Sequence, residues 1–349
     1  MPRTAESVGL LPERLRNQKL VASTCRTAEA VVSHLGAVQS QDYTGAVWAL
    51  GLRAPGLLHA SVEASFSAGR ILRTHVLRPT WHFVVPADIR WMLALTGPQV
   101  QARMRPYDKS LELDAKVYIK ARALMEGALE GGRHLTREEL SAALRRGRIV
   151  ATGQRLAHLV MHAELEGAIC SGPRRGKQFT YALLEERAPR ARMLARDEAL
   201  AELARRYFAS HGPATLRDFA WWSGLKVKDA AAGASLAKAA VLASGPARSR
   251  APGADYLLPN YDEYLIAYKD RGAVVDADRS RSLGLSMAYP HQVVLDGRVA
   301  GSWQRQLTDT RGTVVVKSYT PLNKRQLRAL AAQVEACGRF FERPWRLEV

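Results

Sequence analysis

Apolar and polar residues in the middle of the chain follow a pattern that predicts two helices and then a hairpin. Thr136 and Glu139 have the spacing of a helix capping box, and apolar residues at helical spacing follow them. A second apolar stripe, spaced i, i+3, i+4, i+7, covers residues 152–163. Residues 169–171 and 179–182 then predict two short strands. Helix, turn, helix and hairpin, in this order, indicate a winged-helix unit.

The same order returns on both sides of this unit, in weaker form. Downstream, a helical stripe over residues 200–208 precedes Thr215 and Asp218, which repeat the capping pattern. The wing of this copy is expected to be reduced or absent, because residues 246–253 have the composition of a loop. Upstream, a helical face precedes a strand–break–strand pattern over residues 76–85, which indicates a first unit.

The last hundred residues have a different pattern, dominated by strands. An Asp296-Gly297 turn lies between strand-forming residues, which predicts a tight hairpin. A further strand at 312–317, a helix around 327–334 and a final strand at 345–349 complete a small β-rich domain.

The expected fold class is therefore α+β, with tandem winged-helix units ahead of a β-rich domain. The predicted domains are an N-terminal winged-helix-like unit with bridging helices, a second winged helix, a third with a reduced wing, and a C-terminal domain. Their boundaries are 1–130, 131–190, 191–250 and 251–349.

The charge of the chain favours a polyanionic partner. Lys and Arg number 51 against 33 acidic residues, giving a formal net charge of +18 among 349 residues. Such an excess attracts DNA through long-range electrostatics and counterion release. A solvated basic surface without any such partner is the alternative, since an Arg-rich composition alone produces the same number.

Polar and cationic residues gather where winged helices meet DNA. The predicted second helix of the middle unit begins with donors for phosphates or base edges, the loop of its hairpin is basic, and the third unit opens a helix with two lysines. These candidates are Gln154, Arg155, His158, Arg174, Arg175, Lys177, Lys226 and Lys228. A role in packing or protein contact is the alternative for such a unit.

Several classes of site are not indicated by the sequence. The three cysteines lie far apart without a CxxC pair, and His158 and His162 lack a third ligand, so no metal is expected. Phosphate-binding, dinucleotide-binding, serine-hydrolase and zinc-protease motifs are missing, so no cofactor is expected. Without a signal peptide or a long apolar run, we expect a monomer in the cytoplasm, associated with the nucleoid and not with a membrane.

The most unusual polar cluster is Gln39-Ser40-Gln41-Asp42. Two glutamines two apart lie on the same side of an extended backbone but roughly 200° apart on a helix. An extended segment would let both amides converge on one small target such as a water, whereas a helical one would leave a surface or capping role. The residues alone leave both open.

Four ordered segments make the chain resemble the winged-helix family that includes the DNA glycosylases AlkZ and YcaQ. The segments are GAVQSQ at 36–41, LRPTWH at 77–82, LPNYDEYL at 258–265 and DGRVAGSW at 296–303. The resemblance implies tandem winged helices followed by a β-barrel-like domain. It also implies a catalytic motif of Gln, an aliphatic residue, then Gln or Asp, onto which Gln39 and Gln41 fall while Ser40 departs. Thr80, His82 and Arg298 lie in these segments and join the DNA-contacting candidates.

The implied activity is removal of an alkylated base from double-stranded DNA. A purine alkylated at N7 or N3 is a cationic leaving group, so the lesion itself removes much of the barrier to breaking the N-glycosidic bond. Two amides that hold the attacking water can then be sufficient for catalysis. Asp42 is the rival, since its carboxylate can activate the water or stabilise the sugar cation. A winged-helix regulator or lesion-binding protein without chemistry is the competing class, and a protein-interaction scaffold is a third.

Overall fold

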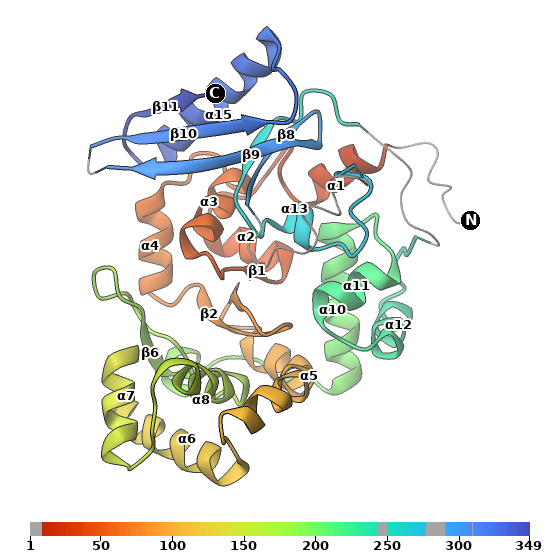
Figure 1. The fold of residues 1–349 in the computed structure, drawn as a ribbon. Helices are drawn as coiled ribbons and strands as arrows, with labels where there is room; N and C mark the ends of the chain where they lie inside the picture. Colours follow the sequence, from red (N-terminus) through yellow and green to blue (C-terminus); the bar gives the residue numbers. More distant parts are fainter. Residues whose placement is uncertain (1–8, 243–249, 277–289, 309) are drawn as a thin grey trace.

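The structure is a computed structural model that describes residues 9–242, 250–276, 290–308 and 310–349. Its first unit contains α2 (Ala28–Leu35), β1 (Val38–Gln39), α3 (Tyr43–Arg53), α4 (His59–Ser67), β2 (Leu72–His75) and β3 (Trp81–Val84). The strands form an antiparallel sheet in the order β1-β3-β2 (Figure 1). The sequence had placed the first strand of the pair later, from residue 76. The alternation of apolar and polar residues did not indicate β2, because polar residues of this strand are buried. Arg73 and His75 form hydrogen bonds inside the protein.

The second unit repeats this order of elements. It contains α6 (Ala115–Leu129), β4 (Leu135–Thr136), α7 (Arg137–Arg146), α8 (Gly153–Leu165), β5 (Ile169–Ser171) and β6 (Thr180–Leu183), in a sheet of order β4-β6-β5. The long helix α5 (Ile89–Ser110) joins it to the first unit, and α9 (Leu184–Arg187) follows it. Thr136 caps α7 and completes the capping box with Glu139 that the sequence predicted.

A third group consists of α10 (Arg196–His211), α11 (Leu216–Ser223) and α12 (Val227–Leu236). Thr215 caps α11 through Asp218, again as the sequence indicated. Gly224 ends α11 with φ +71°, and a side chain there would meet the Leu77 carbonyl oxygen, so both the turn and the packing require glycine. Part of the loop predicted at 246–253 lies outside the described residues, so the reduced wing stays a prediction.

The C-terminal part is an open sheet covered by a helix. It contains β7 (Tyr256–Leu258), α13 (Glu263–Ile266), β8 (His291–Leu295), β9 (Arg298–Leu307), β10 (Gly312–Ser318), α15 (Lys324–Phe340) and β11 (Trp345–Glu348). The strand order is β11-β10-β9-β8-β7. Asp296 and Gly297 both have positive φ, which fits the tight β8–β9 turn predicted from the sequence.

The expectation of a β-barrel-like C-terminal domain is corrected by this sheet. Among the described strands, β11 and β7 form its two edges and do not pair with each other, so no barrel closes. Helix α15 packs on the sheet, and its Leu330, Val334 and Phe340 share a core with Trp48 of the first unit. The sheet therefore buries one face against helices, whereas the strands of a barrel would enclose the core among themselves.

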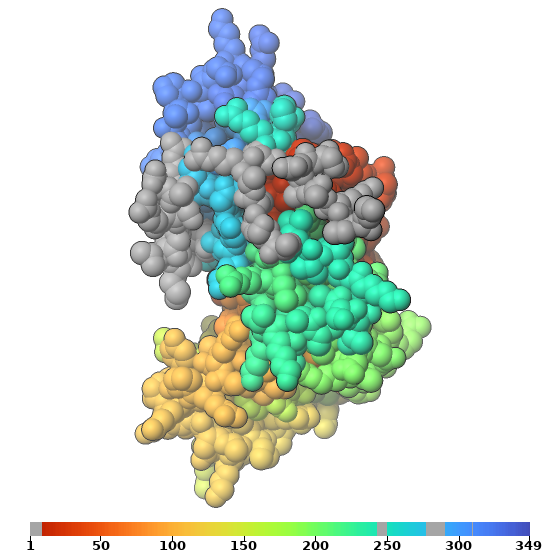
Figure 2. Space-filling model, turned by 90° about the vertical axis from the view of Figure 1, so that its right-hand side faces the viewer, coloured from red at the N-terminus to blue at the C-terminus, as the bar shows by residue number. Residues whose placement is uncertain are grey.

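The parts of the chain are held together by shared cores. One apolar cluster combines residues 25–83 with residues 257–340, and another joins the first unit to α5 and to α10–α12. Helix α1 (Leu10–Asn17) packs with the C-terminal segment through Leu11 and Leu15. In Figure 2 the α10–α12 group, green to teal, lies between the orange-to-yellow residues below and the blue C-terminal part above. The region around β1 thus lies where several parts of the chain meet.

Candidate active site

Gln39 lies on β1 with both its backbone and its side chain engaged. Its backbone N–H donates to Glu263 Oε1 at 3.0 Å, and its side-chain Oε1 accepts from Arg78 Nη2 at 3.0 Å. A guanidinium has donors and no acceptor, so it is the amide oxygen that faces Arg78. No hydrogen-bond partner of the Gln39 amide nitrogen is found in the part of the chain that the structure describes. Gln39 therefore has an NH₂ donor to offer a ligand, and its carbonyl oxygen is turned toward Arg78.

Gln41 lies two residues after Gln39 and is exposed. The Ser40 N–H donates to the Trp81 carbonyl at 2.7 Å, which keeps the backbone extended beyond β1. The segment is therefore not helical between Gln39 and Gln41, and the chain bends at Gln41 before α3 begins. Gln41 Oε1 accepts from the Trp81 N–H at 3.4 Å, a long hydrogen bond that leaves the oxygen free to accept another.

Asp42 is the N-cap of α3. Its Oδ1 accepts from the Gly45 N–H at 3.2 Å and lies 3.4 Å from Arg305 Nη2 on β9. Its side chain is 23% exposed, so it remains reachable from solvent. Capping and the ion pair are structural uses of the carboxylate, and they compete with a role in chemistry.

A buried polar network lies beneath Gln39. Glu263 is buried, and its Oε2 accepts from Trp222 Nε1 at 2.9 Å and lies 3.5 Å from His211 Nε2. Burial acts to raise the pKa of Glu263, but His211, Arg78 and the Gln39 N–H outweigh it and lower the pKa to about 2. The carboxylate is therefore ionised at neutral pH and balances the half-buried guanidinium of Arg78, which holds Gln39.

His82 completes the network from β3, directly opposite Gln39 in the sheet. It is fully buried, its Nδ1 is 2.9 Å from the Thr80 carbonyl, and its Nε2 is 3.4 Å from Arg78 Nη2. Burial and then the charge of Arg78 lower the pKa of His82 to about 3. The ring is neutral, with Nδ1–H donating to Thr80 and Nε2 facing the guanidinium as an acceptor.

Arg78 and Glu263 belong to this network, and residue patterns alone did not indicate them. Both lie inside the segments that carried the resemblance, 77–82 and 258–265, so those segments were the available indication. The neighbouring Asp262 forms a buried two-fold salt bridge with Arg53, with both N···O distances 2.8 Å. This pair fixes the 258–265 segment to α3, next to the glutamines.

Comparisons with known proteins identify the family of the chain. A family profile described as "DNA glycosylase AlkZ-like" matches residues 32–340, most of the chain. The chain belongs to the AlkZ-like DNA glycosylase family. A curated relative from Streptomyces sahachiroi, "Interstrand DNA cross-link repair glycosylase", is 26% identical over 318 residues, covering 83% of this chain and 85% of that one. The solved structure "Streptomyces sahachiroi DNA glycosylase AlkZ" has the same fold, with a TM-score of 0.75, 23% identity, and coverage of 97% and 98% of the two chains.

This AlkZ-like protein is therefore a DNA glycosylase, and DNA is its substrate. The alternatives of a regulator or a scaffold without chemistry are not favoured by the family match. No helix within the described ranges is both long and apolar enough to cross a membrane.

The cations on the β5–β6 hairpin of this glycosylase have partners within the protein. Arg174 forms an ion pair with Glu63 of α4 at 3.2 Å, and its guanidinium lies 4.9 Å from the Tyr43 ring centroid. Arg175 pairs with Glu139 at 2.8 Å. Figure 1 shows the hairpin reaching toward α4. Lys177 is exposed. Two of the three predicted wing cations thus help to hold the second unit together or against the first.

The candidates on α8 divide in the same way. Gln154 is exposed at the start of the helix. Arg155 donates to the carbonyls of Leu111 and Glu112, and His158 Nδ1 lies 2.8 Å from Asp108 Oδ1. These two side chains attach α8 to the C-terminal end of α5, and contact of either with DNA stays a prediction.

The remaining candidates lie in several environments. Lys226 and Lys228 are exposed at the start of α12. Arg298 donates to the Ala273 carbonyl and to Asp276 Oδ1, each at 2.6 Å. Thr80 Oγ1 is buried without a hydrogen-bond partner in the described structure. Of these side chains, only the two lysines are exposed to solvent, as a side chain that contacts a DNA phosphate needs to be.

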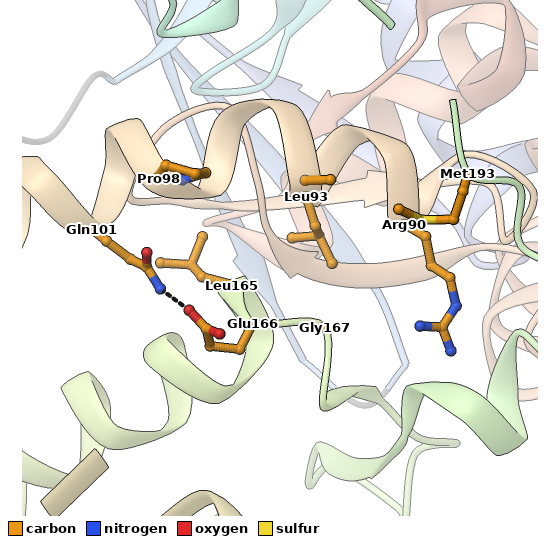
Figure 3. Close-up of a pocket in the computed structure, with 9 residues that line it drawn as sticks. Arg90, Leu93, Pro98, Gln101, Leu165, Glu166, Gly167 and Met193 are labelled. Carbon is orange, nitrogen blue, oxygen red and sulfur yellow. Dashed lines mark hydrogen bonds between the residues drawn. The ribbon is translucent and has the colours of Figure 1, made fainter. Parts of the chain in front are cut away.

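A surface hollow of about 270 Å³ lies between α5 and α8 and is lined by Arg90, Leu93, Ala94, Pro98, Gln101, Leu165, Glu166, Gly167 and Met193. In Figure 3, Gln101 donates a hydrogen bond across it to Glu166. None of its lining residues belongs to the Gln39–Asp42 segment or to the network beneath Gln39. We therefore do not place the chemistry there.

Proposed function

We propose that this glycosylase hydrolyses the N-glycosidic bond of purines made cationic by alkylation at N7 or N3, using a water held by Gln39 and Gln41. The observation that carries the proposal is the contact between Arg78 and the Gln39 carbonyl oxygen. It holds the Gln39 oxygen toward Arg78 and so leaves the Gln39 NH₂ to donate, whereas the longer hydrogen bond from Trp81 leaves the Gln41 oxygen the more readily available acceptor. Together they can hold a water by its oxygen and by one of its protons.

The reaction needs no strong base when the leaving group is a cation. The C1′–N bond breaks with its electron pair moving to the base, which becomes neutral, and C1′ develops oxocarbenium character. Gln41 accepts a hydrogen bond from the water while the Gln39 NH₂ donates to its oxygen, which orients a lone pair toward C1′. The C1′–O bond forms, and a water proton passes to solvent. An uncharged base lacks this leaving-group assistance, so selectivity arises at the chemical step.

Asp42 acts in this proposal through position and charge rather than as the base. Its Oδ1 is committed to the Gly45 N–H and to Arg305, which stabilise the carboxylate and hold it at the start of α3. From there its negative charge can stabilise the developing sugar cation.

The proposal includes the manner of DNA binding. The two helix–strand–helix–helix–strand–strand units have the order of winged helices, and we assign them, with the α10–α12 group, as the tandem DNA-binding units within the boundaries given above. Gln154, Lys177, Lys226 and Lys228 are exposed and are the contacts we favour. Bulky adducts and cross-links fall in the same chemical class when they join the base through N7, and the curated relative's name supports including them.

Base release from defined duplexes tests this function. The wild type is expected to release N7- and N3-alkylpurines under single-turnover conditions and to leave undamaged purines in place. Gln41→Ala should slow release about 10- to 1000-fold, or about 1.4–4 kcal/mol of barrier, while binding of undamaged duplex changes little. Asp42→Asn is the matched control, and its effect should be smaller. No release from any alkylated duplex, or a larger loss for Asp42→Asn than for Gln41→Ala, would refute the proposed chemistry.

A further inference from the structure

A cavity of about 340 Å³ opens beside the glutamine pair, between the first unit and the second. It is lined by Arg73, Trp81, Thr136, Arg137, Glu138, Lys177, Gln178, Phe179 and Tyr181. Trp81 joins it to the proposed active site, because this residue lines the cavity and its backbone N–H donates to Gln41. Three of the lining residues are cations and one is a carboxylate, so the cavity favours an anion.

Arg73 is the unusual member of this lining. It is only 7% exposed, and its Nε and Nη2 both donate to the Ser40 carbonyl at 3.1 Å. Its guanidinium lies 4.3 Å from the Trp81 ring centroid and 4.7 Å from that of Phe179. These contacts fix the guanidinium in place against the peptide between Gln39 and Gln41.

The charge of Arg73 has no counterion in the described structure. No carboxylate of the described residues lies within ion-pair distance of it, and Glu164, which favours its charged form from farther away, is hydrogen-bonded to His75. Burial lowers the pKa of Arg73 to about 10, which still leaves it charged at neutral pH. A buried, uncompensated cation that borders a cavity is stabilised when an anion enters.

A second, exposed charge also lines the cavity. Lys177 is exposed and lines it from the β5–β6 hairpin, whereas Arg137 donates to the Gly153 carbonyl at 3.3 Å. Glu138 is the carboxylate in the lining and lies on the exposed side of α7. An incoming anion therefore meets Lys177 at the surface and Arg73 inside.

We propose that this cavity binds one phosphodiester group of the damaged strand, between Arg73 and Lys177. The inference rests on the proposed function, because it makes the site part of lesion positioning. Arg73 would bind the phosphate while it also donates to the Ser40 carbonyl. The sugar next to that phosphate would then be held at a fixed position relative to the amides of Gln39 and Gln41. Ser40 is suited to this, since its side chain is buried and its carbonyl is used by Arg73. One phosphate, rather than the whole backbone, then determines which nucleotide faces the water.

Single-phosphate neutralisation tests the site without requiring base release. A methylphosphonate, which is uncharged, is moved one position at a time along a duplex that carries a tetrahydrofuran abasic analogue, and binding is measured for each position. The wild type should show one position near the analogue where affinity falls about tenfold, the size expected for a charge-assisted hydrogen bond. In Lys177→Ala, neutralising that same phosphate should lower the affinity by only about threefold or less. The phosphate has already lost its contact with Lys177 in this variant, so removing its charge costs less binding.

Lys228→Ala is the matched control, an exposed lysine on α12 that does not line the cavity. It should lower overall affinity and leave the position-specific loss unchanged. A second variant, Arg73→Lys, keeps the charge but loses the two-fold contact to Ser40, and its folding is checked by thermal unfolding. We expect it to reduce the position-specific loss as well. A uniform loss along the duplex, or equal sensitivity in the wild type and Lys177→Ala, would overturn the phosphate site.

Failure of this inference is distinguishable from failure of the proposed function. The binding experiment uses an analogue that has no base to release, so position-specific coupling to Lys177 can be found in a protein that proves unable to cleave. Conversely, base release that depends on Gln41 without any position-specific coupling would leave the chemistry intact and remove the phosphate site.

Discussion

Gln39 shows how a neighbouring side chain decides what an amide can do. Arg78 can only donate, so it fixes the Gln39 oxygen toward itself and leaves the NH₂ for a ligand. Residue types and spacing marked Gln39 and Gln41 as an unusual polar pair, and the family resemblance supplied their catalytic role. They could not select Arg78 or Glu263, because Glu263 meets Gln39 across 224 positions of sequence, and local patterns carry no information on such contacts.

His82 provides a test of the network in terms of pH. In the folded protein its pKa is lowered from 6.5 to about 3 by burial and by Arg78, so it stays neutral where an unfolded chain takes up a proton. Stability attributable to His82 is therefore complete above about pH 6.5 and falls as the pH drops toward 3, by up to about 1.4 kcal/mol per pH unit. Glu263 adds a loss of the same sign only below its ordinary pKa of 4.5.

His82→Gln should remove this dependence, because glutamine can bond to Thr80 and Arg78 without titrating. Urea unfolding of both proteins at pH 7.5, 6 and 5 measures it. The wild type should lose about 1 kcal/mol more than the variant between pH 6 and pH 5. Parallel changes in stability for the two proteins over this range would show that His82 is not held neutral.

At the scale of elements, the structure confirms the features that depend on neighbouring residues. The capping boxes at Thr136 and Thr215, the Asp296-Gly297 turn and the helix carrying Leu330 were all predicted from local patterns. The open C-terminal sheet was not, because closure depends on whether β7 and β11 meet, and strand patterns are the same in both cases. Arg155 likewise has the composition of a DNA contact but donates to the end of α5.

The two caps should have measurable and similar effects on stability. Thr136→Ala and Thr215→Ala each remove a hydroxyl that accepts from a backbone N–H in the first turn of a helix. Each should lower the free energy of unfolding by about 1 kcal/mol, measured by urea titration. Thr152→Ala is the control, because Thr152 precedes α8 without a side-chain capping bond and is exposed. An effect of Thr152→Ala as large as the other two would contradict the capping account.

At the scale of the molecule, the proposed active site is assembled from parts far apart in sequence. The first unit supplies Gln39 and Gln41, α11 supplies Trp222, and the C-terminal part supplies Glu263 and Arg305. The shared cores explain why these parts hold a fixed relation, since residues 25–83 and 257–340 bury the same apolar cluster. The sequence alone separated the chain into four successive domains and could not show that the residues of the proposed site come together from several of them.

The central claim is that Gln39 acts as a donor and Gln41 as an acceptor, and exchange of each for glutamate tests it most directly. Single-turnover release of N7-methylguanine from duplex DNA is measured for Gln39→Glu and Gln41→Glu beside the two alanine variants. Gln39→Glu should be as slow as Gln39→Ala, because the donor is lost and the new carboxylate stays paired with Arg78. Gln41→Glu keeps an acceptor and should exceed Gln41→Ala by about tenfold or more. The reverse order, or release that survives in the Gln39→Ala/Gln41→Ala double variant, would contradict the account.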